Sequence, residues 1–215
     1  MAKGTSETVN WEEGLIIKTF GLTKIFEGYP LLDAWLTVEN DLDAADIQLL
    51  EKRRHKLVRS MSGWNEETLK MKFIALLLDM VEYDSDIFEG TFDAELKGVV
   101  QGKRLSVVAD YAVSKSTFGF KEQPYFYFHE YKPRKRANDP FAQLLLAMLI
   151  AQEKHEHTNR LYGCAVIGEN WYFMILDGKT YSISTGFLST HPDGLQKILL
   201  ILRKFKHILN TELAV

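Results

Sequence analysis

Three charged residues, Asp110, Glu130 and Lys132, stand in segments whose other residues are mostly apolar or aromatic. Asp110 lies within SVVADYAV, and Glu130 and Lys132 end the run YFYFHEYK. Carboxylates gathered in one place repel one another, and a hard divalent cation such as Mg²⁺ or Mn²⁺ neutralises them. Such a cation activates water and offsets the charge of a phosphate group. The three residues therefore predict phosphodiester hydrolysis, with Lys132 orienting the water or stabilising the phosphorus under attack.

The elements that must position these residues are strands, because the hydrophobic pattern there has a period of two. Three strands are expected over residues 91–100, 103–115 and 124–132. Gln101-Gly102 is a tight hairpin signal between the first two. Since side chains alternate along a strand, Glu130 and Lys132 share one face, and His129 is a packing or edge residue on the other. An antiparallel return would bring Asp110 opposite the end of the third strand.

A helix is expected over residues 64–83, before the first of these strands. Asn65 can cap it, and acidic residues in its first turn suit the helix dipole. Glu66 lies on the apolar face and can reach the same point as the strand residues, whereas Glu67 is turned about 100° away. The apolar face consists of Leu69, Phe73, Leu76, Leu77 and Met80.

A basic cluster follows the third strand and consists of Arg134, Lys135 and Arg136. We interpret it as a contact to nucleic-acid phosphates, or else as a solvated loop. The next helix begins at Pro140 with Asn138 or Asp139 as its cap, and its N-terminus also favours phosphate. Further strands and a closing amphipathic helix are expected near 160–168, 171–177, 179–185 and 193–210.

The length and composition are those of a globular protein, with 215 residues, 46% hydrophobic, and a formal net charge of −3. This acidity does not exclude nucleic-acid binding, because a local basic patch matters more than the total. Cys164 is the only cysteine and lies in an apolar run, so we expect a core thiol in the reducing cytoplasm. There is no signal-like segment and no run near the roughly 18 apolar residues of a membrane span, so no membrane contact is expected.

The order helix, three strands, helix, strand, with Asp110 and the triplet Glu130-Tyr131-Lys132, resembles the PD-(D/E)XK nuclease superfamily. The segments WNEETLKMKFI, HEYK, DPFAQLLLAM and YGCAVIGENWYF also resemble a family of small bacterial proteins with this core. The resemblance covers residues 64–177. It implies an α/β, restriction-endonuclease-like core with a mixed central sheet flanked by helices. We therefore expect an N-terminal helical extension, 1–63, and a nuclease-like domain, 64–215.

Carried over to this sequence, the resemblance implies that Asp110, Glu130 and the backbone carbonyl of Tyr131 are metal ligands. Lys132 would be the catalytic lysine. Glu66 matches an acidic residue that many members carry on the first helix.

Gln143 matches a glutamine found one turn into the second helix in the exonuclease-like branch. The sequence departs from the pattern at two positions. Ala109 stands where many members have proline before the aspartate, and Ala147 stands where that branch commonly has an aromatic residue.

Each of these residues also has a purely structural interpretation. Glu130 and Lys132 would form a surface pair at a strand end, and Asp110 would accept hydrogen bonds from a neighbouring turn. Glu66 would favour the helix N-terminus, and Gln143 would satisfy a buried backbone group.

The resulting prediction is a Mg²⁺- or Mn²⁺-dependent nuclease acting on DNA. The alternative is a catalytically silent nuclease-fold protein that binds partners or serves as a scaffold in a bacterial defence or mobile-element system. Net acidity and the lack of a second, DNA-reading domain argue for the alternative. Either protein could form a homodimer, with LLILRKFKHIL as the interface of a scaffold.

Overall fold

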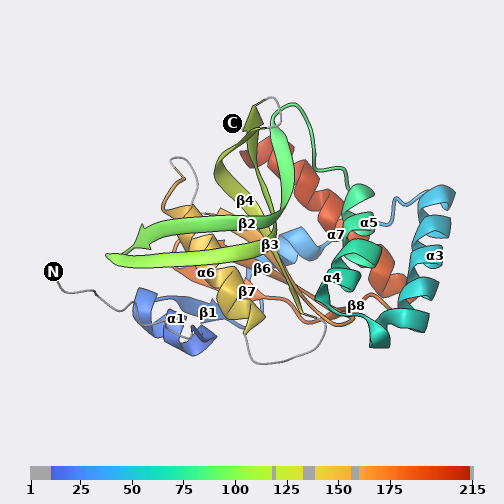
Figure 1. Cartoon of the computed structure of the whole chain (residues 1–215), viewed down its shortest axis with the longest axis horizontal. Helices are drawn as coiled ribbons and strands as arrows, with labels where there is room; N and C mark the ends of the chain where they lie inside the picture. Colours follow the sequence, from blue (N-terminus) through green and yellow to red (C-terminus); the bar gives the residue numbers. More distant parts are fainter. Residues whose placement is uncertain (1–10, 118–119, 133–138, 156–159, 214–215) are drawn as a thin grey trace.

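The computed structural model describes residues 11–117, 120–132, 139–155 and 160–213, with only the backbone described over 120–124. The chain is an α/β protein built on one mixed sheet of eight strands (Figure 1). The strand order is β1-β7-β6-β5-β4-β3-β2, and β8 pairs with β6. The strands are β1 (Thr23–Ile25), β2 (Phe88–Val100), β3 (Lys103–Thr117), β4 (Phe120–Lys132), β5 (Arg160–Ile167), β6 (Asn170–Asp177), β7 (Thr180–Ile183) and β8 (Phe187–Leu188).

The three strands expected from the period of two are present as β2, β3 and β4, which pair antiparallel. Gln101 and Gly102 join β2 to β3 with φ of 46° and 79°. Positive φ at both positions is typical of a tight hairpin turn, which confirms the turn expected there. β4 then pairs parallel with β5, and α6 (Pro140–Gln152) makes the crossover between them.

Helices cover both faces of the sheet (Figure 1). α6 packs in one apolar cluster with residues of β2 and β3. The opposite face carries α2 (Pro30–Leu36), α5 (Ala75–Asp79) and α7 (Pro192–Ile208) in a second, aromatic cluster. No helix in the described part of the chain is long and apolar enough to cross a membrane.

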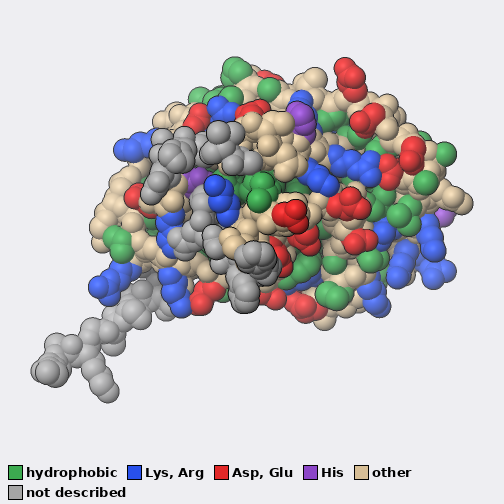
Figure 2. All heavy atoms as spheres, turned by 90° about the horizontal axis from the view of Figure 1, so that it is seen from above, with side chains coloured by type: hydrophobic (Ala, Val, Ile, Leu, Met, Phe, Trp, Pro, Cys, Tyr) green, Lys and Arg blue, Asp and Glu red, His purple; other side chains and the backbone are tan. Residues whose placement is uncertain are grey.

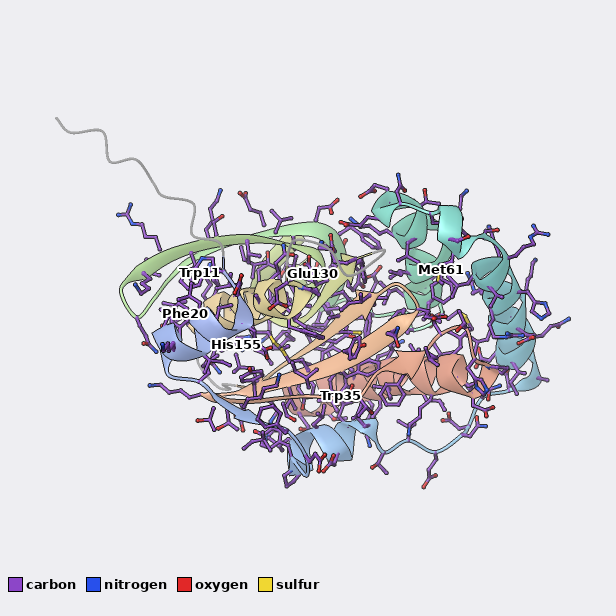
Figure 3. All side chains as sticks on the ribbon, turned by 90° about the horizontal axis from the view of Figure 1, so that it is seen from below. Trp11, Phe20, Trp35, Met61, Glu130 and His155 are labelled. Atoms are coloured by element: carbon purple, nitrogen blue, oxygen red, sulfur yellow. The ribbon has the colours of Figure 1, made fainter. Side chains whose placement is uncertain are left out.

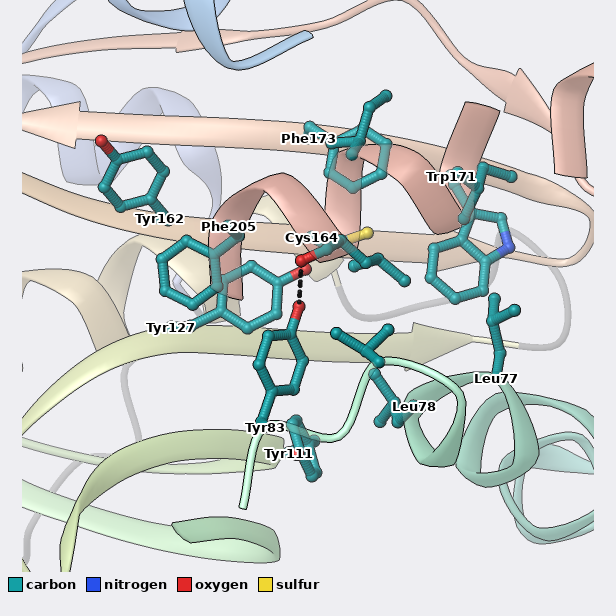
Figure 4. Close-up of a cluster of buried hydrophobic side chains, with 14 of the residues drawn as sticks. Leu77, Leu78, Tyr83, Tyr111, Tyr127, Tyr162, Cys164, Trp171, Phe173 and Phe205 are labelled. Atoms are coloured by element: carbon teal, nitrogen blue, oxygen red, sulfur yellow. Dashed lines mark hydrogen bonds between the residues drawn. The ribbon is translucent and has the colours of Figure 1, made fainter. Parts of the chain in front are cut away.

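α7 contributes Leu199 and Phe205 to the aromatic cluster, where Phe205 stacks on Tyr127 with ring centroids 4.4 Å apart (Figure 4). Eight of its apolar residues are buried. The apolar face of α7 is thus covered within the chain, and an oligomer interface on this helix stays a prediction.

The N-terminal part is mainly helical, as expected, with α1 (Glu13–Phe20), α2, α3 (Ala44–Ser60) and a 3-10 turn (Met61–Gly63). It also supplies β1, which pairs parallel with β7. Trp35 of α2 is buried and donates a hydrogen bond from Nε1 to the carbonyl oxygen of Ile201, at 3.1 Å. Residues on both sides of position 63 therefore share one sheet and one core, and a boundary between 63 and 64 stays a prediction.

The helix expected over 64–83 forms in three parts. Asn65 caps α4 (Glu66–Leu69) by accepting a hydrogen bond from Thr68 N–H, as predicted. A π-helical turn (Lys70–Ile74) follows, and α5 continues from it. The wide turn changes the phase of the helix, so the expected apolar face is wrong at Leu76, which is exposed, while Leu78 is buried.

Candidate functional site

The candidate site lies in a fork of the sheet. β3 pairs with β4 only as far as Tyr111, which faces His129. Beyond that point β4 continues beside β5, with Glu130 opposite Ala165, while β3 continues beside β2 alone. Asp110 is the first β3 residue past the fork, so it comes next to the end of β4, as the antiparallel return predicted.

A local irregularity marks the fork. Asp93 on β2 has φ of 53°, a left-handed conformation that is uncommon outside glycine. Ala94 and Ala109 form a pair that packs with α6, whereas the next pair along the ladder, Phe92 and Tyr111, packs on the opposite face. Residues two apart on a strand normally point to the same face of the sheet. The alternation of faces is therefore shifted by one residue at the level of Asp110.

The Asp110 carboxylate is held by the backbone of β4. Its Oδ2 accepts a hydrogen bond from Tyr131 N–H at 2.6 Å, and the residue is 8% exposed. The donor belongs to the neighbouring strand and not to a turn, so the structural interpretation made for Asp110 was wrong in its partner. The role of the Tyr131 carbonyl as a metal ligand stays a prediction.

Glu130 and Lys132 point the same way from β4 and form an ion pair, with 2.7 Å between Nζ and Oε1. Glu130 is only 2% exposed, so this is not the surface pair considered from the sequence. Figure 3 shows Glu130 among the side chains in the interior of the fold. Glu66 of α4 approaches Lys132 to 3.6 Å, so the helix and the strand meet at this lysine.

Burial changes the acidity of these groups. Loss of solvation, with a smaller contribution from Asp110, raises the pKa of Glu130 to about 8, although Lys132 opposes the shift. Burial also lowers the pKa of Lys132, but Glu130, Asp110 and Glu66 together outweigh this and leave a net rise. Carboxyl groups with so strongly shifted a pKa are found more often at functional sites than elsewhere.

Lys70 is a site residue that the sequence reasoning missed. Its Nζ lies 2.9 Å from Asp93, 3.3 Å from Glu67 and 3.6 Å from Asp110. A lysine in an amphipathic helix normally indicates a solvated face, but this one is buried, with the buried Phe73 and Ile74 three and four residues further on. Glu67, three residues earlier, was the available signal, since residues with this spacing meet on a helix.

The other predicted residues lie apart from these contacts or outside the described residues. Gln143 is half-buried on α6, and its Oε1 has no hydrogen-bond partner in the described part of the chain. The basic cluster falls within 133–138, which the structure does not describe. Asp139 caps α6 by accepting hydrogen bonds from the N–H groups of Phe141 and Ala142. Those two amides are thus already engaged, which weakens the expectation that this N-terminus binds phosphate.

Acidic side chains gather on the face shown in Figure 2, where basic side chains surround them. Within the described residues, no three His, Cys, Asp or Glu side chains lie close enough to hold a metal ion by themselves. Mg²⁺ is commonly held by only one or two carboxylates together with water and phosphate, a donor set that Asp110 and Glu130 can supply.

Similarity to known proteins gives no indication of the function of this chain. No model of a known protein family matches the chain, and no curated protein matches it significantly.

Proposed function

We propose that this protein is a cytoplasmic, Mg²⁺- or Mn²⁺-dependent nuclease with a restriction-endonuclease-like core, which hydrolyses phosphodiester bonds of DNA. The observation that carries the proposal is the meeting of Asp110, Glu130 and Lys132 at the fork between β3 and β4. A triplet such as Glu130 to Lys132 often occurs in a sequence by chance. Burial of these charges at a strand fork costs free energy, and a function of the site would explain why they are kept there.

The donor set fits a hard divalent cation. Asp110 and Glu130 provide carboxylate oxygens, and their mutual repulsion contributes to the raised pKa of Glu130. A cation held by these two residues would neutralise the attacked phosphate and activate water. Tyr131 N–H orients the Asp110 carboxylate, so this ligand is already fixed in place.

Lys132 is the residue that would act on substrate. Its ammonium group is held between Glu130 and Glu66, at 2.7 and 3.6 Å. In this position a positive charge can stabilise the negative charge that develops on phosphate, and an N–H can orient water. Glu66 acts on Lys132 and is therefore a positioning residue. The adjoining cluster Arg134 to Arg136 would bind the nucleic-acid backbone.

Cleavage of fluorescent single- and double-stranded DNA, with Mg²⁺ or Mn²⁺, tests this function. Asp110→Ala and Lys132→Ala should each abolish metal-dependent cleavage while circular dichroism shows an intact fold. Lys56→Ala removes an exposed lysine of α3 and should cleave like the wild type. Unchanged cleavage in either site variant would refute the mechanism.

The ion pair between Lys132 and Glu130 favours a second function, in which the site is silent. The two charges neutralise each other in part, and a binding or scaffold protein needs nothing more from them. This function, in a defence or mobile-element system, predicts nucleic-acid or protein binding without metal-dependent turnover. Binding of labelled DNA by wild type and by Asp110→Ala, with no cleavage in either, would support it.

A further inference from the structure

Lys70 is a buried lysine surrounded by carboxylates. It is 3% exposed, and three carboxylates lie within ion-pair distance of its Nζ, with Asp93 the nearest. Lysine is almost never fully buried unless it is paired. Burial lowers the pKa of Lys70, but the neighbouring carboxylates more than compensate and leave a net rise. Lys70 is therefore a fixed positive charge beside Asp110.

Two unusual backbone features bring this charge to the site. The π-helical turn begins at Lys70, and such turns occur frequently at functional sites. Asp93, on β2, takes its left-handed conformation directly across from Asp110 and interrupts the ladder between the two strands. Strained residues of this kind persist where the surrounding structure requires them. Both features meet at the same ion pairs, so Lys70 has a defined place in the site.

Among the residues that the structure describes, the charges of the site are unbalanced even with this lysine. Lys132 is paired with Glu130 and Glu66, and Lys70 with Glu67, Asp93 and Asp110. Outside the undescribed segment 133–138, five carboxylates thus face two lysines. One divalent cation would reduce the excess of negative charge, whereas without Lys70 the repulsion beside Asp110 would be larger. The oxygens around Lys70 are of the type that Mg²⁺ and Mn²⁺ prefer.

We propose that Lys70 is a positioning residue that holds Asp110 and takes the place of a second divalent cation, so that each chain binds one cation. The proposal rests on the proposed function, because it assumes one cation at Asp110 and Glu130. It adds that the neighbouring group of carboxylates is occupied by an ammonium group of the chain itself.

Calorimetric titration of the full chain with Mn²⁺, without nucleic acid, tests the proposal. Wild type should bind one Mn²⁺. Lys70→Gln keeps most of the side-chain length without its charge, and it should bind two, because Asp93 and Asp110, together with water, are then free to accept a cation. Lys70→Arg keeps the charge and should bind one. Lys72→Gln is the matched control, since it removes an exposed lysine of the same turn, and it should also bind one.

A second variant keeps the proposal falsifiable if Lys70→Gln does not fold. Asp93 is exposed, and asparagine tolerates its left-handed conformation, so Asp93→Asn should fold. Because Lys70 would then interact more strongly with Asp110, the Mn²⁺ dissociation constant should rise about two- to fivefold, the worth of an exposed ion pair. An unchanged dissociation constant would overturn the role of Lys70.

The outcomes separate the two proposals. Wild type that binds no Mn²⁺ would overturn the proposed function and with it this inference. Wild type that binds one Mn²⁺, with Lys70→Gln also binding one, would overturn the inference alone. Wild type that binds two Mn²⁺ would likewise show that Lys70 replaces no cation, while leaving the nuclease function intact.

Discussion

Replacing Glu130 with glutamine should remove a pH-dependent cost from folding. Burial raises the pKa of this carboxyl group from 4.5 to about 8, so the native state binds its proton more tightly than the unfolded state. Between these two pKa values the native state holds more protons, and the free energy of unfolding therefore falls as pH rises. Glutamine has a similar shape and does not ionise, so the variant should lack this part of the decline.

The pKa shift of Glu130 determines how much the free energies of unfolding of wild type and variant should diverge as pH rises. Each pKa unit corresponds to about 1.4 kcal/mol, so the full shift corresponds to roughly 5 kcal/mol. An accessible range from about pH 5.5 to about pH 8.5 covers most of the titration, and the difference between variant and wild type should grow there by about 3 kcal/mol. Comparing slopes is safer than comparing absolute stabilities, because glutamine also weakens the contact of Lys132 at every pH.

Urea unfolding followed by tryptophan fluorescence, in metal-free buffer with EDTA, measures this difference at each pH. Glu39→Gln, at an exposed glutamate, is the matched control for the same chemical change. If wild type and Glu130→Gln lose stability in parallel as pH rises, Glu130 is not a buried group that titrates with a raised pKa. Glu130 would then lack the raised pKa on which its role as a cation-binding carboxylate depends.

Three further variants test how the site is supported. His129→Leu should raise the free energy of unfolding by about 1–3 kcal/mol, because both ring nitrogens are buried without partners among the described residues. Burial lowers the pKa of His129 to about 3, so wild type should lose stability below about pH 6.5, and acid unfolding should show a smaller loss in His129→Leu. Asp139→Ala removes the cap of α6, and urea unfolding should show a loss of about 1 kcal/mol. Gly102→Ala, at φ of 79°, should lower stability by about 1 kcal/mol in the same assay, whereas an unchanged midpoint would mean that the hairpin turn relaxes.

Local patterns in the sequence were sufficient to predict the main elements. The period of two predicted β2, β3 and β4, although β3 and β4 are buried on both faces along part of their length. The Gln101-Gly102 turn, the Asn65 cap and the start of α6 at Pro140 also follow from local backbone chemistry. Since alternation puts Glu130 and Lys132 on one face, their ion pair was within reach of the sequence.

Tertiary structure decided what the local patterns leave open. A hydrophobic period does not reveal a π-helical turn, so the exposure of Leu76 was not predictable. The pairing of β1 with β7 depends on residues more than 150 positions apart, which a local pattern does not relate. The raised pKa of Glu130 likewise arises from the whole fold, because desolvation depends on every element that excludes water from the carboxyl group. The sequence alone thus determined which charged groups stand on which strands, and the tertiary structure decided how deeply they are buried and that a second lysine joins them.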